Sequence, residues 1–140
     1  MWRVGFTCGA FDLCHPGHML MFQQCKERCR YLVVGLQEDP SIDRSHKNKP
    51  IQSVKERKII LESVRYVDEI IVYRTETDLY EYLRLNAGRI DVRFLGEDWK
   101  GKPFTGHEIA IPAEFTRRAS YSSSELRRRI YEAEVARRSV

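Results

Sequence analysis

Gly9-Ala10-Phe11-Asp12-Leu13-Cys14-His15-Pro16-Gly17-His18 follows the first apolar run of the chain, Arg3 to Thr7, and precedes a segment with helical spacing. The run has the length and composition of a strand, and a proline is favoured in the first turn of a helix. The quoted stretch is therefore a turn that joins a strand to a helix N-terminus, where backbone N–H groups lack intrahelical partners. Backbone amides and two imidazoles that converge in this way predict a phosphate-binding site.

Strand-like runs alternate with helical segments along the rest of the chain. Tyr31 to Leu36 is a continuous apolar run, typical of a strand buried on both faces of a parallel sheet. Further strands are expected at 69–73, 90–95 and 108–112. Helices are expected to begin near Pro16, after Ser53, at Thr77 or Asp78, and near Ser122. This alternation predicts an α/β fold, a doubly wound parallel sheet of about five strands that is Rossmann-like, in a single domain spanning residues 1–140.

Two of these helices open with the pattern of a capping box, Ser53 with Glu56 and Ser122 with Glu125. Periodicity predicts which side chains of the two helices face the core. The expected inward residues are Ile59, Ile60, Ser63, Val64, Leu126, Ile130 and Val135.

Four segments are expected at the carboxyl ends of the strands, the edge at which doubly wound sheets bind ligands. They are the opening turn, the polar loop 37–50, the loop from Gly96 to Pro103, and the start of the last helix. Their convergence is the first indication of where the functional site lies.

Charge and composition narrow the class of protein. The 140 residues are 42% hydrophobic and carry a net charge of +4. Seven arginines against four glutamates lie between Glu114 and Val140, which can indicate nucleic-acid binding. Because they alternate on an apparent amphipathic helix, a solvated face with a phosphate-facing edge is favoured. No signal-peptide pattern or membrane-length apolar run occurs, so we expect a cytoplasmic protein without membrane or nucleic-acid partners.

All four cysteines lie in the first strand–turn–helix unit. Disulfides are disfavoured in a chain without secretory features. A zinc site made from Cys8, Cys14, His15 and His18 is an alternative, but no CxxC pair is present. We therefore expect no protein-ligated metal.

The chain resembles a known family at four ordered motifs. The opening turn resembles the GxFDxxHxGH signature of the HxGH nucleotidyltransferases, and the small cytidylyltransferases of the glycerol-3-phosphate type are most similar. The segments 55–62 and 64–69 resemble the middle of those proteins, and Gly96-Glu97-Asp98-Trp99-Lys100-Gly101 resembles their GDDWxG. Arg117 to Leu126 occupies the place of their RTEGISTTxI.

The resemblance implies a reaction and its partners. An acceptor bearing a phosphate or phosphonate would attack the α-phosphorus of CTP, and pyrophosphate would leave. Mg²⁺ would be bound mainly through the nucleotide phosphates, and the protein would be a homodimer. Catalysis would consist of positioning and charge stabilisation, without a covalent intermediate.

The resemblance also implies roles for individual residues. Catalytic roles fall to His15, His18, Lys49, Arg117 and Ser123. Nucleotide binding falls to Thr7, Gly9, Ala10, Phe11, Asp12, Gly17, Lys47, Gly96, Asp98, Trp99, Tyr121, Ser122 and Ser124. Acceptor binding falls to Arg65, Lys47 and Trp99.

Each of these residues also has a purely structural interpretation. The histidines could simply start a helix, and the lysines could lie in a solvated loop. Arg65 could be a cation at a helix end, and Trp99 could belong to the core. Ser122 could act as an N-cap alone, although capping explains one serine and not three in a row.

Two departures from the family pattern bear on the substrates. Ala10 replaces a threonine beside the phosphate. Arg117-Arg118-Ala119-Ser120-Tyr121 replaces the Arg-Thr-Glu-Gly-Ile that helps to recognise the base. Adenylyl transfer from ATP is therefore an alternative, and a non-catalytic nucleotide sensor or RNA-binding module is a second one. The acceptor stays open among glycerol- or ribitol-phosphate-like, amino-phosphate and phosphonate compounds.

Overall fold

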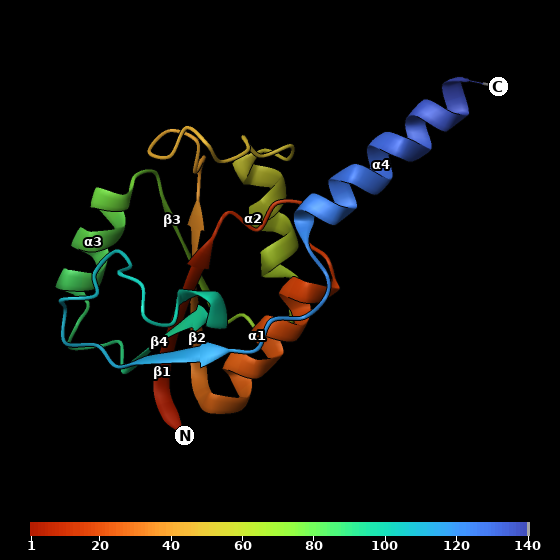
Figure 1. Ribbon diagram of the computed structural model, residues 1–140. Helices are drawn as coiled ribbons and strands as arrows, with labels where there is room; N and C mark the ends of the chain where they lie inside the picture. Colours follow the sequence, from red (N-terminus) through yellow and green to blue (C-terminus); the bar gives the residue numbers. More distant parts are fainter. Residues whose placement is uncertain (140) are drawn as a thin grey trace.

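Five parallel strands form one sheet in the computed structural model, which describes residues 1–139 (Figure 1). The strand order is β3-β2-β1-β4-β5, and every neighbouring pair is parallel. The strands are β1 (Trp2–Gly9), β2 (Cys29–Gln37), β3 (Glu69–Tyr73), β4 (Val92–Gly96) and β5 (Ala113–Thr116). The helices are α1 (Pro16–Arg28), α2 (Val54–Glu62), α3 (Glu76–Leu85) and α4 (Ser123–Arg138), with the short 3-10 helix η1 (Glu97–Trp99) after β4. The predicted doubly wound α/β fold is confirmed.

The apolar run in β2 explains the layering, because its side chains alternate between the two faces of the sheet. Leu32, Val34 and Leu36 pack with α1 and α2 on one face. Val33 belongs to the second cluster, which includes Leu79 of α3 on the other face. Figure 1 shows the same arrangement, with α3 on one side of the strands and α1 and α2 on the other. Both faces are therefore covered, as a parallel sheet requires.

The last helix differs from the sequence-based expectation. Its N-terminus joins the sheet edge, but the helix then projects away from the body (Figure 1). Ile130 and Val135, which were expected to face inward, are 52% and 44% exposed, and Leu126 is only partly buried. The periodicity correctly predicted that this helix has an apolar face. It did not predict that this face is left uncovered by the rest of the described chain.

The position of one strand, the start of one helix and the buried face of another helix also differ from the predictions. The fifth strand lies at Ala113–Thr116 and not at 108–112, a segment that is irregular apart from the turn ending at Glu108. Helix α3 begins earlier, because Thr75 is its N-cap and accepts a hydrogen bond from the Asp78 N–H. In α2, Ile59 is exposed and the buried residues are Arg57 and Leu61.

The order of the strands fixes where a ligand can bind. Strands β1 and β4 are neighbours, yet the chain leaves them toward opposite sides of the sheet, so their carboxyl ends, Gly9 and Gly96, flank the crevice of the fold. Within residues 1–139, no helix is long and apolar enough to cross a bilayer.

Candidate active site

The turn between β1 and α1 has a strained backbone that its neighbours hold in place. Phe11 and Leu13 have φ values of 48° and 50°, in the left-handed region that disfavours side chains. The Leu13 N–H donates to Gln52 Oε1 at 2.8 Å, and Arg57 donates to the Ala10 carbonyl at 2.8 Å. Such strain persists where surrounding contacts determine the conformation, and it is concentrated at functional sites.

Arg57 is the central support of this turn. Arg57 is 1% exposed, and within residues 1–139 its guanidinium donates to four backbone carbonyls and to no carboxylate. The carbonyls belong to Ala10, Gln37, Glu38 and Gln52. Burial lowers the pKa of Arg57, although the nearby acidic groups oppose this effect. One side chain therefore joins the turn, the end of β2 and the segment that leads into α2.

Asp12 has a structural role that the sequence did not predict. Its carboxylate accepts hydrogen bonds from the Ile51 and Gln52 N–H groups at 2.8 and 2.9 Å. It also forms an ion pair with Arg127 of α4 at 3.0 Å. Asp12 therefore fastens the loop and the last helix to the turn instead of offering free oxygens to a ligand.

The two histidine rings are in contact at the start of α1, with centroids 3.9 Å apart and planes tilted by 30°. The Gly17 N–H donates to His15 Nδ1 at 3.0 Å, and the His15 N–H donates to His18 Nδ1 at 3.3 Å. Because both Nδ1 atoms accept, the proton of each neutral ring lies on Nε2. His18 lines a cavity, so its Nε2–H is available as a donor there.

Burial keeps both rings neutral. Burial and, to a smaller extent, the neighbouring His15 lower the pKa of His18 from 6.5 to about 4, and Asp12 opposes part of this effect. Burial also lowers the pKa of His15. Two adjacent imidazoles that are neutral at pH 7 do not repel each other, and a neutral ring can still donate a hydrogen bond to an anionic oxygen.

The start of α4 completes this arrangement. Ser122 caps the helix by accepting from the Glu125 N–H at 3.1 Å, but Glu125 turns to Arg128, so only half of the predicted capping box forms. Ser123 Oγ lies 3.2 Å from His15 Nε2 and 3.4 Å from the Asp12 carbonyl oxygen. The His15 ring is thus linked through one hydroxyl to the opening turn.

Gly17 is required where α1 meets this segment. A Cβ at Gly17 would lie 2.7 Å from the His15 ring and 3.0 Å from the Tyr121 carbonyl oxygen. Only a residue without a side chain allows His15 to fold back over the helix start.

Two cavities adjoin at this edge of the sheet. The first, here called the histidine cavity, has a volume of about 410 Å³. Its lining includes His18, Lys47, Ser123, Ser124 and Arg127. The second, here called the aromatic cavity, has a volume of about 590 Å³. Its lining includes Tyr73, Tyr80, Arg93, Phe94, Trp99 and Phe104.

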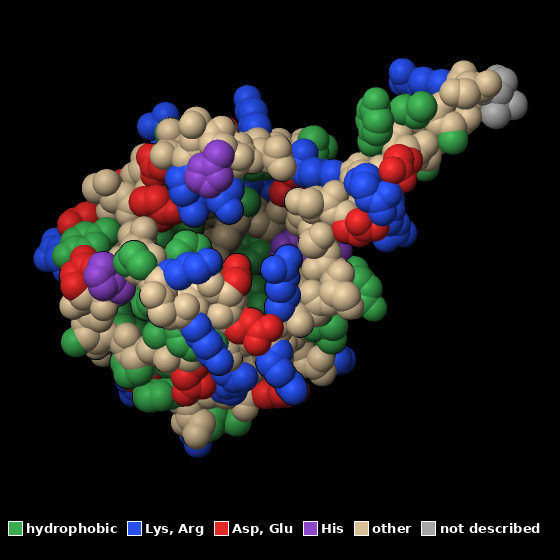
Figure 2. All heavy atoms as spheres, in the orientation of Figure 1, with side chains coloured by type: hydrophobic (Ala, Val, Ile, Leu, Met, Phe, Trp, Pro, Cys, Tyr) green, Lys and Arg blue, Asp and Glu red, His purple; other side chains and the backbone are tan. Residues whose placement is uncertain are grey.

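The cavities share a wall that includes Gly9, Gln37 and Trp99. Figure 2 shows a hollow in this face, with Lys and Arg side chains around its rim and hydrophobic side chains inside. The volumes of the two cavities lie in the range of small-molecule binding sites.

Most of the predicted site residues gather around these cavities. Those lining one or both are Thr7, Gly9, Ala10, Phe11, Asp12, His18, Lys47, Gly96, Trp99, Ser123 and Ser124. His15 and Gly17 contact this set through Ser123 and the Tyr121 backbone.

Other predicted residues lie elsewhere. The Lys49 side chain is exposed and lines neither cavity, while its carbonyl accepts from Arg127. The backbone of Arg117 pairs with the Gln24 side chain, so the arginine lies outside the cavities. Asp98 and Tyr121 are exposed and also line neither cavity.

Arg65 lies at the edge of the sheet opposite the carboxyl ends of the strands, so within one chain it is not brought together with the other predicted residues. It lies between the C-terminal end of α2 and the start of β3, where its guanidinium donates to the Tyr66 hydroxyl. Parallel strands all begin at that edge, opposite Gly9 and Gly96.

The zinc interpretation also finds no support. Within residues 1–139, no group of three or more His, Cys, Asp or Glu side chains is placed to hold a metal ion. Cys14 Sγ instead points to the Phe11 carbonyl oxygen at 3.6 Å.

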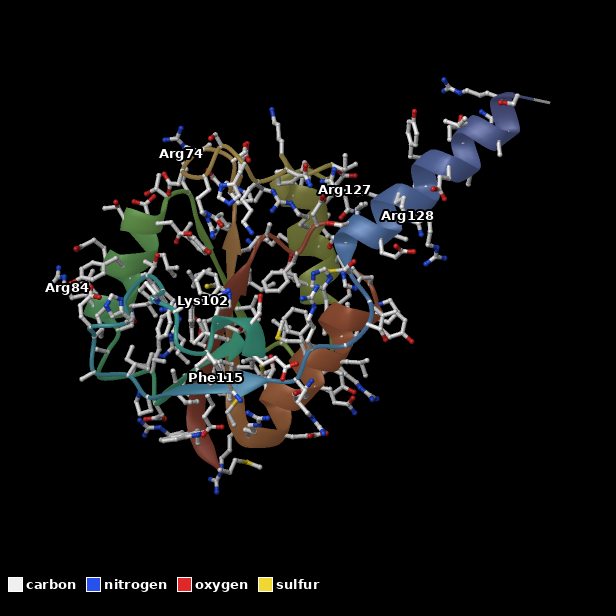
Figure 3. The ribbon with its side chains drawn as sticks, in the orientation of Figure 1. Arg74, Arg84, Lys102, Phe115, Arg127 and Arg128 are labelled. Carbon is white, nitrogen blue, oxygen red and sulfur yellow. The ribbon has the colours of Figure 1, made fainter. Side chains whose placement is uncertain are left out.

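Several arginines at the site are not predictable from a sequence motif. Arg127 points from α4 toward the body and contacts Asp12 and Lys49, whereas Arg128 pairs with Glu125 and Glu132 on the projecting helix (Figure 3). The run of three arginines carried no signal that distinguished them. Arg57 and Arg93 were also missed, because buried arginines inside a helix or a strand do not belong to a local phosphate motif.

Comparisons with known proteins agree with this geometry. The sequence profile of the family described as cytidylyltransferase-like matches residues 6–129. The chain is 39% identical over 99 residues to the bifunctional protein HldE of Acidiphilium cryptum and 34% identical over 110 residues to that of Caulobacter vibrioides. These matches cover 70% and 78% of the chain. The chain spans about a fifth of the length of these relatives, whose matched shares are 20% and 22%.

A solved structure shares the fold. The crystal structure of the lipopolysaccharide core biosynthesis protein from Thermoplasma volcanium matches with a TM-score of 0.65 and 22% identity. The match covers 87% of this chain and all of that one. The similarities do not single out the glycerol-3-phosphate type expected from the sequence. The family profile and the HldE relatives together show that the chain belongs to the cytidylyltransferase-like family of nucleotidyltransferases.

Proposed function

We propose that the protein transfers a nucleotidyl group from a nucleoside triphosphate to a phosphate or phosphonate oxygen of a small acceptor. The observation that carries this proposal is the pair of neutral imidazoles, which share one cavity edge with the N-terminus of α4. The His18 Nε2–H, the Ser124 hydroxyl and the first N–H groups of α4 are all donors suited to phosphate oxygens.

The reaction needs no nucleophile from the protein. An acceptor oxygen attacks the α-phosphorus, a new oxygen–phosphorus bond forms, and the bond from that phosphorus to the bridging oxygen of the β-phosphate breaks. Pyrophosphate takes the electron pair and leaves. His15 and His18 would stabilise the charge on the α-phosphoryl oxygens, and Lys47 would close over the phosphates from the loop. We therefore propose that the cysteines are dispensable.

The lining of the two cavities supports a choice among the predicted loop lysines and acceptor-binding residues. The lining of the histidine cavity supports Lys47 over Lys49 as the lysine that contacts the triphosphate. Trp99 remains a candidate for both substrates, because it lines both cavities. Arg117 would act only if the substrate drew its side chain inward.

We propose that Mg²⁺ accompanies the nucleotide rather than a protein site. Of the described residues that line the histidine cavity, Asp12 alone is acidic, and its oxygens are already bonded to Ile51, Gln52 and Arg127. A hard cation would thus be held by phosphate oxygens and water. It would supply charge neutralisation on the triphosphate.

CTP is the first candidate for the donor, since the family motifs around the turn and Trp99 are those of cytidylyltransferases. ATP is the second, and a specific observation favours it. The segment 117–121 departs from the base-reading pattern, and Tyr121 is exposed beside the site. A non-catalytic nucleotide- or RNA-binding role is disfavoured by the intact donor set around His18.

We also propose that the protein is a homodimer. The projecting part of α4 exposes Ile130, Tyr131 and Val135, and a second copy could cover this apolar face. Closed two-fold dimers are the commonest assembly of soluble proteins.

The decisive experiment measures pyrophosphate release with CTP and with ATP against a panel of small phosphates and phosphonates. We expect turnover with one of the two nucleotides. His18→Ala should lower kcat by about 100-fold, the loss associated with one transition-state donor. His46→Ala, at an exposed loop position, is the matched control. Near-normal turnover in folded His18→Ala protein would refute the catalytic assignment.

A further inference from the structure

The aromatic cavity contains a buried cation that the nucleotide chemistry does not use. Arg93 projects from β4, a central strand, and is 5% exposed. Its guanidinium donates to the Thr105 carbonyl, lies 3.9 Å from Cys8 Sγ and stacks on the Phe104 ring at 4.9 Å. Among these contacts within residues 1–139 there is no carboxylate. A buried charge without a counter-ion is costly, so its presence beside a cavity indicates a ligand.

Two further donors on the same wall have no partner. Gln37 is 2% exposed, and its Nε2 makes no hydrogen bond in the described chain. Arg44 Nε is also buried without a partner, although the other end of that guanidinium pairs with Glu76 at 2.9 Å. Both residues line the aromatic cavity as well as the histidine cavity. The unused groups are all N–H donors, which select an oxygen-rich, anionic ligand.

The acidic residues of the aromatic cavity do not cancel this preference. Glu76 is paired with Arg44, and Glu108 lies at the exposed rim beside His107. Arg93 therefore keeps the only unpaired full charge in the buried part of the described lining. The Arg93 guanidinium carbon lies over the Phe104 ring, 4.9 Å from its centroid, and a guanidinium carries N–H donors that can bind phosphate or carboxylate in two places.

The position of Arg93 connects it to the transfer site. Arg93 pairs with Phe6 of β1, three residues before Gly9, and its guanidinium reaches the level of Cys8. An anion on Arg93 would therefore lie just across the shared wall of Gly9 and Gln37 from the histidine cavity. Two substrates that react with each other must be bound in neighbouring sites, and the two cavities are neighbours in this sense.

We infer that the aromatic cavity is the acceptor site and that Arg93 binds the anionic group of the acceptor, together with the free N–H groups of Gln37 and Arg44. The identification as an acceptor site rests on the proposed nucleotidyl transfer, whereas the anion site rests on the contacts alone. The acceptor is a small phosphate-, phosphonate- or carboxylate-bearing metabolite whose body packs on aromatic walls. Arg93 thus takes the role that the sequence assigned to Arg65.

The anion site can be tested without turnover, because the Cys8 thiol lines the cavity beside Arg93. The rate of Cys8 alkylation by anionic iodoacetate is divided by the rate with neutral iodoacetamide, with the modified residue identified by mass spectrometry. Any effect of Arg93 on thiol reactivity alone cancels in this ratio. We expect Arg93→Met to lower the ratio about tenfold, a modest part of a close charge–charge attraction. Arg93→Lys and the exposed Arg3→Met should keep it.

Acceptor kinetics then test the assignment. With the phosphate and phosphonate panel, Arg93→Met should raise the acceptor KM about tenfold or more, as expected for a lost charge-assisted contact, and leave the dissociation constants of CTP and ATP within about twofold. Weaker nucleotide binding instead would show that the aromatic cavity holds the base, and would overturn the inference. An unchanged alkylation ratio would overturn the anion site.

Two outcomes separate this inference from the proposed function. A ratio that falls in Arg93→Met protein, in a chain that transfers neither nucleotide, would support the anion site and overturn nucleotidyl transfer. Turnover that proceeds with an unchanged acceptor KM would support transfer and overturn the role of Arg93. If Arg93→Met does not fold, Gln37→Met tests the same wall, since the Nε2 group that it removes makes no hydrogen bond in the described chain. The ratio should fall in that variant as well.

Discussion

Acidification provides a direct test of the buried imidazole pair. Burial lowers the pKa of His18 to about 4 in the folded chain, against 6.5 for a free side chain. The unfolded chain therefore binds more protons between these two values, so stability is complete above about pH 6.5 and is lost as the pH falls toward 4. One pKa unit corresponds to about 1.36 kcal/mol, and after allowance for the partial exposure of the ring we expect a loss of about 2 kcal/mol at about pH 4.5.

The assay is urea unfolding at a series of pH values in the wild-type protein and in His18→Gln. Carboxylates also titrate in this range, but they do so in both proteins, so the difference between the two curves isolates the imidazole. The wild type should lose about 2 kcal/mol more than His18→Gln between about pH 7 and about pH 4.5. His46→Gln, in the exposed loop, should follow the wild type.

Two results would refute this reasoning. Parallel pH profiles for the wild type and His18→Gln would mean that the ring is not desolvated. A direct NMR titration of the His18 ring with a midpoint near 6.5 would mean the same.

Three further perturbations test the architecture of the site. Arg57→Met should lower the free energy of unfolding by about 3 kcal/mol, because four carbonyls lose a buried donor; a loss under about 1 kcal/mol in urea unfolding would contradict this. Gly17→Ala should reduce kcat/KM about tenfold by displacing His15, whereas Gly88→Ala, where a Cβ meets nothing within 4 Å, should leave it unchanged. Replacing Val135 with Glu should convert the proposed dimer to a monomer in sedimentation experiments; a monomeric wild type would refute the dimer.

The order of strands and helices was predictable because each depends on local patterns. The apolar run from Tyr31 to Leu36 and the glycine turn before Pro16 predicted the core strand and the first helix correctly. The fifth strand was misplaced, because a short edge strand of four residues carries little periodicity. Its true position depends on its pairing with β4. This pairing starts at Arg93, whose N–H donates to the Pro112 carbonyl.

The site was predictable only where a motif lies within one segment. His18 and Ser123 belong to such motifs, and the structure brings them to the same cavity edge. The roles of Asp12 and Arg57 depend on partners about forty residues or more away, so their letters alone could not reveal them. In the sequence, Arg93 is a single charged residue within an apolar strand. Its surroundings become apparent only in the structure, where it contacts Phe104 and Thr105.

The projecting helix divides this chain into parts that can be altered separately. Helix α4 meets the opening turn through Ser123 and Arg127, and none of its residues is buried. A rise of about 1.5 Å per residue carries Arg138 about 17 Å beyond Arg127. Reporter groups, affinity tags or engineered contacts placed on that distal segment would sit far from the chemistry. A partner that binds the distal segment would act on the substrates through the few contacts at the start of the helix, those of Ser123 with His15 and Asp12 and those of Arg127 with Asp12 and the Lys49 carbonyl.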